Sequence, residues 1–96
     1  MRAIWFVGIL FVLNFVAFVF VHESIHGEIY RHDGCGDVKF GVGVGFAYTE
    51  CLDVGYVESA NAVFNNMLNE VVGYNVELLI VTVYVLLIGY LFIKGV

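Results

Sequence analysis

The sequence predicts a mainly α-helical membrane protein with two transmembrane helices and a small β-strand or hairpin between them. Apolar residues make up 61% of the 96 residues, charged residues make up 14%, and proline is absent. A soluble domain of this length buries only part of its surface and would leave much of this apolar area in water. Two long apolar runs, at 3–21 and 78–93, instead suit a bilayer. We expect one membrane-embedded domain over residues 1–96, with the lipid bilayer as a partner.

The first helix is expected to begin near Arg2, to cross the membrane over about 3–21 and to continue to about Arg31. Residues 3–21 carry no charge, and about 20 such residues cross the hydrocarbon core. A cleaved signal peptide is the alternative, but the run is long for one and lacks a small-x-small cleavage site. The turn-rich stretch 32–37 should end the helix.

The net charge of −5 is concentrated between the two apolar runs, where most of the acidic residues lie. Arg2 and Lys94 flank the outer ends of the runs. The positive-inside rule therefore predicts an integral protein of the cell membrane with both termini in the cytoplasm. The chain has no basic patch, so nucleic acid is not expected as a partner.

Residues 38–49 place large apolar side chains at every second position, with Lys39, Thr49 and small residues between them, and this period of two predicts a β element. Twelve residues is long for one strand, so a single strand and a hairpin turning near Gly43 both remain open. Glycines dominate one face, which often marks the close approach of another backbone. An exposed edge here would hold a substrate peptide as an added strand, or the element would only cap the helices.

A second helix is expected from about residue 60, with Ser59 as its N-cap, leading into a second span over about 76–93. The stretch 73–75 is a candidate kink. Asn66, Glu70 and Glu77 form a polar stripe along this otherwise apolar helix. Such a stripe should face protein and not lipid.

The first apolar run ends in the motif H-E-x-x-H, at His22-Glu23-Ser24-Ile25-His26. Two histidines four residues apart lie on one face of a helix and can ligate one Zn²⁺. Glu23 can then take a proton from a zinc-bound water, which makes it the candidate catalytic base. The alternative is that these side chains only mark the point where the helix leaves the bilayer.

A catalytic zinc site needs a third protein ligand and an open position for water. Glu70 is the first candidate, because it lies on the polar stripe of the second helix. The rival ligands are Glu58, Asp53 and His32. Glu70 on the solvated side of an amphipathic helix is the non-functional alternative.

The motif from His22 to His26 resembles that of the zincin metallopeptidases, and its place at the end of a membrane helix resembles the site-2 proteases. Lys39-Phe40-Gly41 and Ala47-Tyr48 are similar to a strand of small zincin-like peptidases of bacteria and archaea. Asn69-Glu70 is similar to the pair that supplies the third ligand in glutamate-type zincins. The resemblance implies that the two histidines bind zinc and that Glu23 is the base.

The chain also departs from these families. Site-2 proteases usually take their third ligand from an aspartate in a proline-containing motif, and this chain has no proline. They also have more than two spans. The chain would then be a minimal core, a homo-oligomer, or a relative that binds metal without cleaving.

Cys35 and Cys51 bracket the alternating segment. In an oxidising compartment they would form a disulfide that clamps the base of a hairpin. A metal site shared with His32 and two free thiols are the other interpretations, and the spacing does not decide among them.

Together these features predict a zinc-dependent endopeptidase that acts on a peptide or membrane-protein substrate at or within the membrane. Zn²⁺ is the expected cofactor, bound by His22, His26 and Glu70, with Glu23 as the catalytic residue. The competing hypotheses are a non-catalytic small membrane protein or subunit, and a membrane protein that binds metal without hydrolysis. The peptidase is favoured because a structural zinc site needs no general base, so Glu23 would have no function in one.

Overall fold

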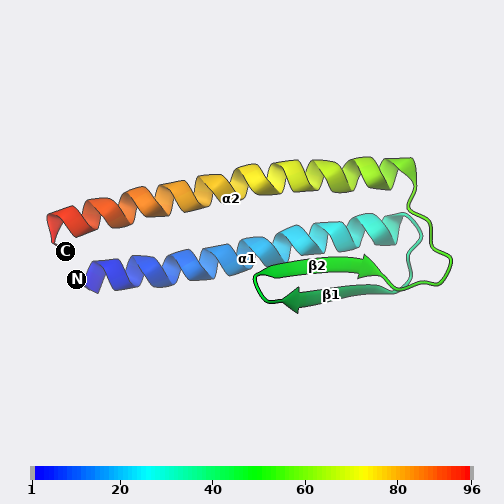
Figure 1. Cartoon of the computed structure of the whole chain (residues 1–96), viewed down its shortest axis with the longest axis horizontal. Coiled ribbons are helices and arrows are strands. Elements are labelled where there is room, and N and C mark those ends of the chain that lie inside the picture. Colours follow the sequence, from blue (N-terminus) through cyan, green and yellow to red (C-terminus); the bar gives the residue numbers. More distant parts are fainter. Residues whose placement is uncertain (1, 96) are drawn as a thin grey trace.

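The chain forms two long antiparallel helices with a β-hairpin between them in sequence. The computed structural model describes residues 2–95, with α1 at Arg2–His32, β1 at Val38–Gly43, β2 at Phe46–Cys51 and α2 at Ala60–Lys94. The helices lie side by side in an elongated body of 58 × 21 × 19 Å, and both ends of the described chain lie together (Figure 1). The hairpin lies beside the C-terminal half of α1. The predicted helical fold with a small β element between two apolar helices is therefore confirmed.

α1 ends one residue beyond the predicted limit, in a glycine-based cap. Gly34 has a φ of +99°, a left-handed conformation that glycine adopts without strain. The Cys35 amide donates to the Tyr30 carbonyl at 2.9 Å, and the Gly34 amide donates to Arg31 at 3.1 Å. These bonds satisfy carbonyls that the last helical turn leaves free, and they turn the chain back along α1.

The β element is a hairpin and not a single strand. β1 pairs antiparallel with β2, with Val38 opposite Cys51 and Gly43 opposite Phe46, so only Val44 and Gly45 form the turn. Opposed residues share a face of the sheet. A single strand would place the large side chains of 38–49 on one face, but in the hairpin the two-residue turn places Phe46 on the same face as Gly43.

This register explains the glycines of β1 in a way the sequence pattern does not. A methyl group on Gly41 would lie 2.0 Å from the ring of Tyr48, and one on Gly43 would lie 2.2 Å from the ring of Phe46. The glycines therefore give room to aromatic rings of the opposite strand. Close approach of a further backbone, which the sequence suggested, is not the reason for them.

α2 begins at the predicted N-cap and continues for 35 residues. The Ser59 hydroxyl accepts a hydrogen bond from the Ala62 amide at 3.1 Å. The helix passes through residues 73–75, the candidate kink, without interruption. Gly73 is buried where α2 faces α1, and this position matters for the site described below.

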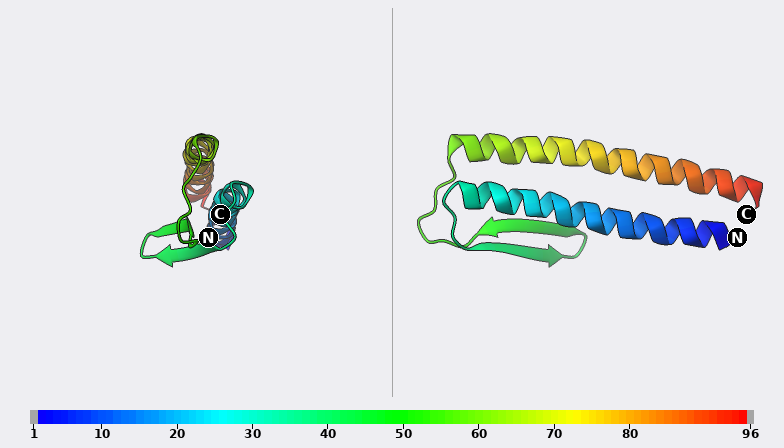
Figure 2. Two further views of the ribbon diagram at one scale, coloured as in Figure 1. Left: turned by 90° about the vertical axis from the view of Figure 1, so that its right-hand side faces the viewer. Right: turned by 180° about the vertical axis from the view of Figure 1, so that it is seen from behind.

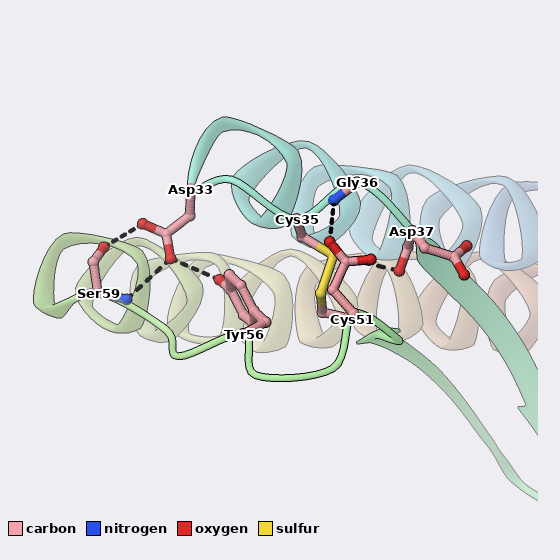
Figure 3. The surroundings of a disulfide bond; sticks show 8 residues. Asp33, Cys35, Gly36, Asp37, Cys51, Tyr56 and Ser59 are labelled. Atoms are coloured by element: carbon pink, nitrogen blue, oxygen red, sulfur yellow. Dashed lines mark hydrogen bonds between the residues drawn. A yellow bond between two sulfur atoms is a disulfide. The ribbon is translucent and has the colours of Figure 1, made fainter.

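The connectors are fastened to the end of α1 by a disulfide and by Asp33 (Figure 3). Cys35 and Cys51 form the disulfide, with a Cα separation of 6.1 Å. Asp33 accepts hydrogen bonds from the Tyr56 hydroxyl at 2.6 Å and from the Ser59 amide at 2.9 Å, as well as from the Ser59 hydroxyl. These bonds hold the pKa of Asp33 below its usual value. Burial, together with Asp33, raises the pKa of Tyr56.

Little of the molecule is buried. Within residues 2–95, the buried apolar side chains are Val7, Cys35 and Ala62. Both helices are long and apolar enough to cross a membrane, and almost no residue in their most apolar stretches is fully buried. Seen along the long axis, the hairpin projects to one side of α1 and leaves the outer surfaces of both helices free (Figure 2).

Candidate metal centre

The structure brings His22 and His26 of α1 together with Glu70 of α2. Nε2 of His26 lies 2.5 Å from Oε1 of Glu70, and Nε2 of His22 lies 3.1 Å from the same oxygen. One ligand atom from each of the three side chains lies within 4.8 Å of the others. His26 is buried, while His22 and Glu70 are half-buried. The polar stripe on α2 therefore faces α1, at the height of the H-E-x-x-H motif.

Asn66 orients the buried histidine. Its side-chain oxygen lies 2.6 Å from Nδ1 of His26, and its amide donates to Glu58 at 2.5 Å. Because the Asn66 oxygen can only accept, Nδ1 of His26 is the donor in this contact, and Nε2 is the nitrogen that faces Glu70. A hydrogen bond on the far nitrogen is the usual device that fixes a metal-ligating imidazole.

Two further residues of α2 determine how closely His22 approaches this helix. The side-chain amide of Asn69 donates to the backbone carbonyl of His22 at 3.1 Å. A methyl group on Gly73 would lie 2.5 Å from Nδ1 of His22 and 2.6 Å from Cε1. Only glycine leaves room for the imidazole at this point of the helix interface.

Glu23 lies beside the cluster and is held by the hairpin. The Thr49 hydroxyl of β2 lies 2.5 Å from Oε2 of Glu23 and 3.0 Å from its backbone oxygen. A hydroxyl has one proton, so it donates to one of these acceptors at a time. The hairpin thereby fixes the position of the candidate base relative to α1.

Two adjoining cavities run between β2 and α2, with α1 as their floor. One has a volume of about 340 Å³ and the other about 220 Å³, and both are lined by Glu23, Ala47 and Glu70. All the hairpin residues that line them belong to β2 or to the turn. The open edge of β2 therefore borders a channel that passes over the His-Glu cluster.

The charges around these cavities favour an ionised Glu70. Burial raises the pKa of Glu70, but hydrogen bonds with His26 and His22 outweigh burial and hold this pKa below its usual value. An ionised carboxylate is the form that binds a metal. Burial and the nearby Glu58 and Glu23 carboxylates raise the pKa of Tyr30, which keeps its phenol neutral at the cavity wall.

The rival ligands lie elsewhere. Asp53 accepts a hydrogen bond from the Gly36 amide at 2.7 Å, next to the disulfide. His32 lines a different groove between the helices, and Glu58 contacts the site only through Asn66. With both cysteines in the disulfide, the structure does not form the alternative metal site of Cys35, Cys51 and His32.

Sequence reasoning did not assign roles to Thr49, Asn69 and Gly73. Asn69 had a usable signal, because it adjoins Glu70. Thr49 contacts Glu23, 26 positions away, and Gly73 contacts His22, 51 positions away. A local sequence pattern does not predict contacts between residues so far apart in the chain.

The three side chains are of the kinds that would hold a catalytic zinc ion. Two imidazole nitrogens and one carboxylate oxygen form a three-ligand set that leaves the fourth position for water. Tetrahedral ligands with bonds of about 2.0–2.1 Å lie roughly 3.3 Å apart. The Nε2–Oε1 separation between His22 and Glu70 is close to this value, at 3.1 Å, and that between His26 and Glu70 is shorter, at 2.5 Å.

Comparisons with models of protein families, with curated proteins and with solved structures find no match for this chain. The resemblance to zincins and site-2 proteases therefore stays a prediction from the motif and its neighbours.

Proposed function

We propose that this protein is a zinc-dependent endopeptidase that acts on peptide segments at the membrane surface or just within it. The observation that carries the proposal is the convergence of His22, His26 and Glu70 from two helices, with Glu23 beside them. These are the ligands and the base of an H-E-x-x-H hydrolase.

The membrane location is supported by the exposure of the two helices. A core helix of a soluble protein is mostly buried, whereas almost no residue in the apolar stretches of α1 and α2 is fully buried. With spans over about 3–21 and 76–93, the His-Glu cluster lies at the boundary of the hydrocarbon layer. Peptide segments that leave the membrane would meet the site at this level.

The residues divide the chemistry among them. When bound, zinc lowers the pKa of its water to about 7 and polarises the substrate carbonyl. Glu23 accepts a proton from the attacking water on its carboxylate and delivers it to the leaving amine as the peptide C–N bond breaks. The open edge of β2 can hold the substrate as an added extended strand along the channel.

The first test measures zinc per chain after purification in detergent without chelators and resupply of zinc. We expect about one zinc in the wild type, a loss in His26→Ala and Glu70→Ala, and retention in His32→Ala, since His32 lies outside the cluster. Glu23→Gln should keep zinc and abolish cleavage of a peptide library.

No zinc in the folded wild type would contradict the proposal. Undiminished cleavage by Glu23→Gln would contradict the role of Glu23 as the catalytic base. Zinc binding with no cleavage by the wild type would favour the alternative of a metal-binding membrane protein without hydrolysis.

A further inference from the structure

The tip of the hairpin is apolar, uncharged and exposed. Val44 is fully exposed and Val42 is 88% exposed. No charged residue occurs from Phe40 to Thr49. The outermost charges are Lys39 and Glu50, which oppose each other in the register. The hairpin therefore changes from charged at its base to apolar at its turn.

The turn lies beside the apolar part of α1 and not beyond the end of the helix. Gly45 and Phe46 line a cavity together with Phe15, Phe18 and Val19 of α1. Figure 1 shows the turn alongside the middle of α1, pointing toward the two chain ends. The hairpin therefore runs back along the helix to the level of the expected first span.

The distance of the turn from the H-E-x-x-H motif can be estimated along the strand and along the helix, and the two estimates agree. Thr49 contacts Glu23, and Phe46 lies three strand residues beyond Thr49, which is about 10 Å at 3.3 Å per residue. Phe15 lies eight helical residues before Glu23, which is about 12 Å at 1.5 Å per residue. The turn thus lies roughly 10 Å below the H-E-x-x-H motif, within the apolar stretch of α1.

We propose that the tip of the hairpin, residues 42–46, inserts into the bilayer beside α1 and has lipid acyl chains as its partner. The inference rests on the membrane placement in the proposed function. Its support is continuity, because the exposed tip extends the exposed apolar surface of α1 at the same level. Residues 52–58 offer a contrast, since Val54 is equally exposed but lies between Asp53 and Glu58, beyond the helix end.

The insertion is shallow. A two-stranded sheet leaves backbone amides and carbonyls unpaired along both outer edges, and hydrocarbon offers them no partner. The edge of β2 faces the channel, but the edge of β1 does not. The tip should therefore rest in the interfacial layer and the upper acyl chains, as amphipathic surface elements do.

Tryptophan probes in lipid vesicles test this inference on the whole chain. Trp5 is the one native tryptophan, so Trp5→Phe gives a silent background for V44W, V54W and V16W. Val44 and Val54 are both fully exposed, so the two variants are matched for exposure and for any preference of tryptophan itself. Val16 reports the span. The readout is quenching by lipids brominated at different depths of the acyl chain.

We expect strong quenching of V44W and V16W, with V44W quenched best by bromines near the headgroup, and little quenching of V54W. Quenching of V16W without V44W would overturn hairpin insertion and leave the span in place. Quenching of V44W and V54W alike would overturn the assignment to the tip. No quenching of V16W would overturn the membrane placement itself. V42W supplies a second tip probe if V44W does not fold.

Discussion

Gly73→Ala tests whether close helix contact at His22 creates the metal centre. The added methyl group would lie 2.5 Å from Nδ1 of His22 and 2.6 Å from Cε1. Ordinary van der Waals separations between such atoms are about 3.5–4.0 Å. Either the imidazole moves by roughly 1 Å or the two helices move apart by a similar distance.

This displacement is large on the scale of a metal site. Metal–ligand distances are expected within about 0.2 Å of their usual values, so a shift of about 1 Å removes His22 from the ligand set. Changes that only disturb the orientation of a ligand already cost about 10–100-fold in metal affinity. We therefore expect Gly73→Ala to weaken zinc binding by roughly 100-fold or more.

Competition with a chromophoric chelator in detergent measures the affinity. Gly89→Ala is the matched control, because it adds the same methyl group to α2 where nothing lies within 4 Å. Both changes favour the helix by up to about 1 kcal/mol, so propensity does not separate them. Wild-type zinc affinity in Gly73→Ala, or an equal loss in Gly89→Ala, would refute the reasoning.

Three further predictions concern residues around the site and the connectors. Thr49→Val removes a hydrogen bond to the Glu23 carboxylate worth about 1.5–3 kcal/mol, so kcat should fall roughly 10–150-fold at unchanged zinc content. Thr49→Ser should restore most of kcat, and a failure of this rescue would contradict a positioning role. Asn66→Leu removes the hydrogen bond that orients His26 and should lower zinc affinity about 10–100-fold in the same chelator assay. Unchanged affinity would contradict this role of Asn66. Hydrogen bonds, chiefly from Ser59, lower the pKa of Asp33, so its contribution to stability is full above about pH 4 and is lost as the pH falls through the lowered value. Denaturation across pH should therefore show Asp33→Asn to be less stable than wild type at pH 7, with a difference that shrinks below about pH 4; a constant difference would count against it.

The sequence predicted the helices, the β segment and the polar stripe, because each rests on a local period. It also paired Glu70 with the motif, since a carboxylate on an apolar helix needs a protein partner. It did not predict the faces of the hairpin, because a two-residue turn decides them and the alternating pattern continues through Val44 unchanged. Nor did it predict the role of Gly73, which depends on a histidine 51 positions earlier.

The contacts that would bind zinc are also among those that hold the two helices together. Helices in lipid gain little from apolar burial and associate through small residues and hydrogen bonds. In the proposed membrane placement, α1 and α2 would associate in this way at Gly73, through the hydrogen bond from Asn69 to the His22 carbonyl, and through the bond from Asn14 to Tyr84 between their apolar stretches. Removal of a ligand therefore also loosens the helix pair. The zinc affinities of the ligand variants are therefore compared with that of Gly89→Ala, which alters the same helix and leaves this interface intact.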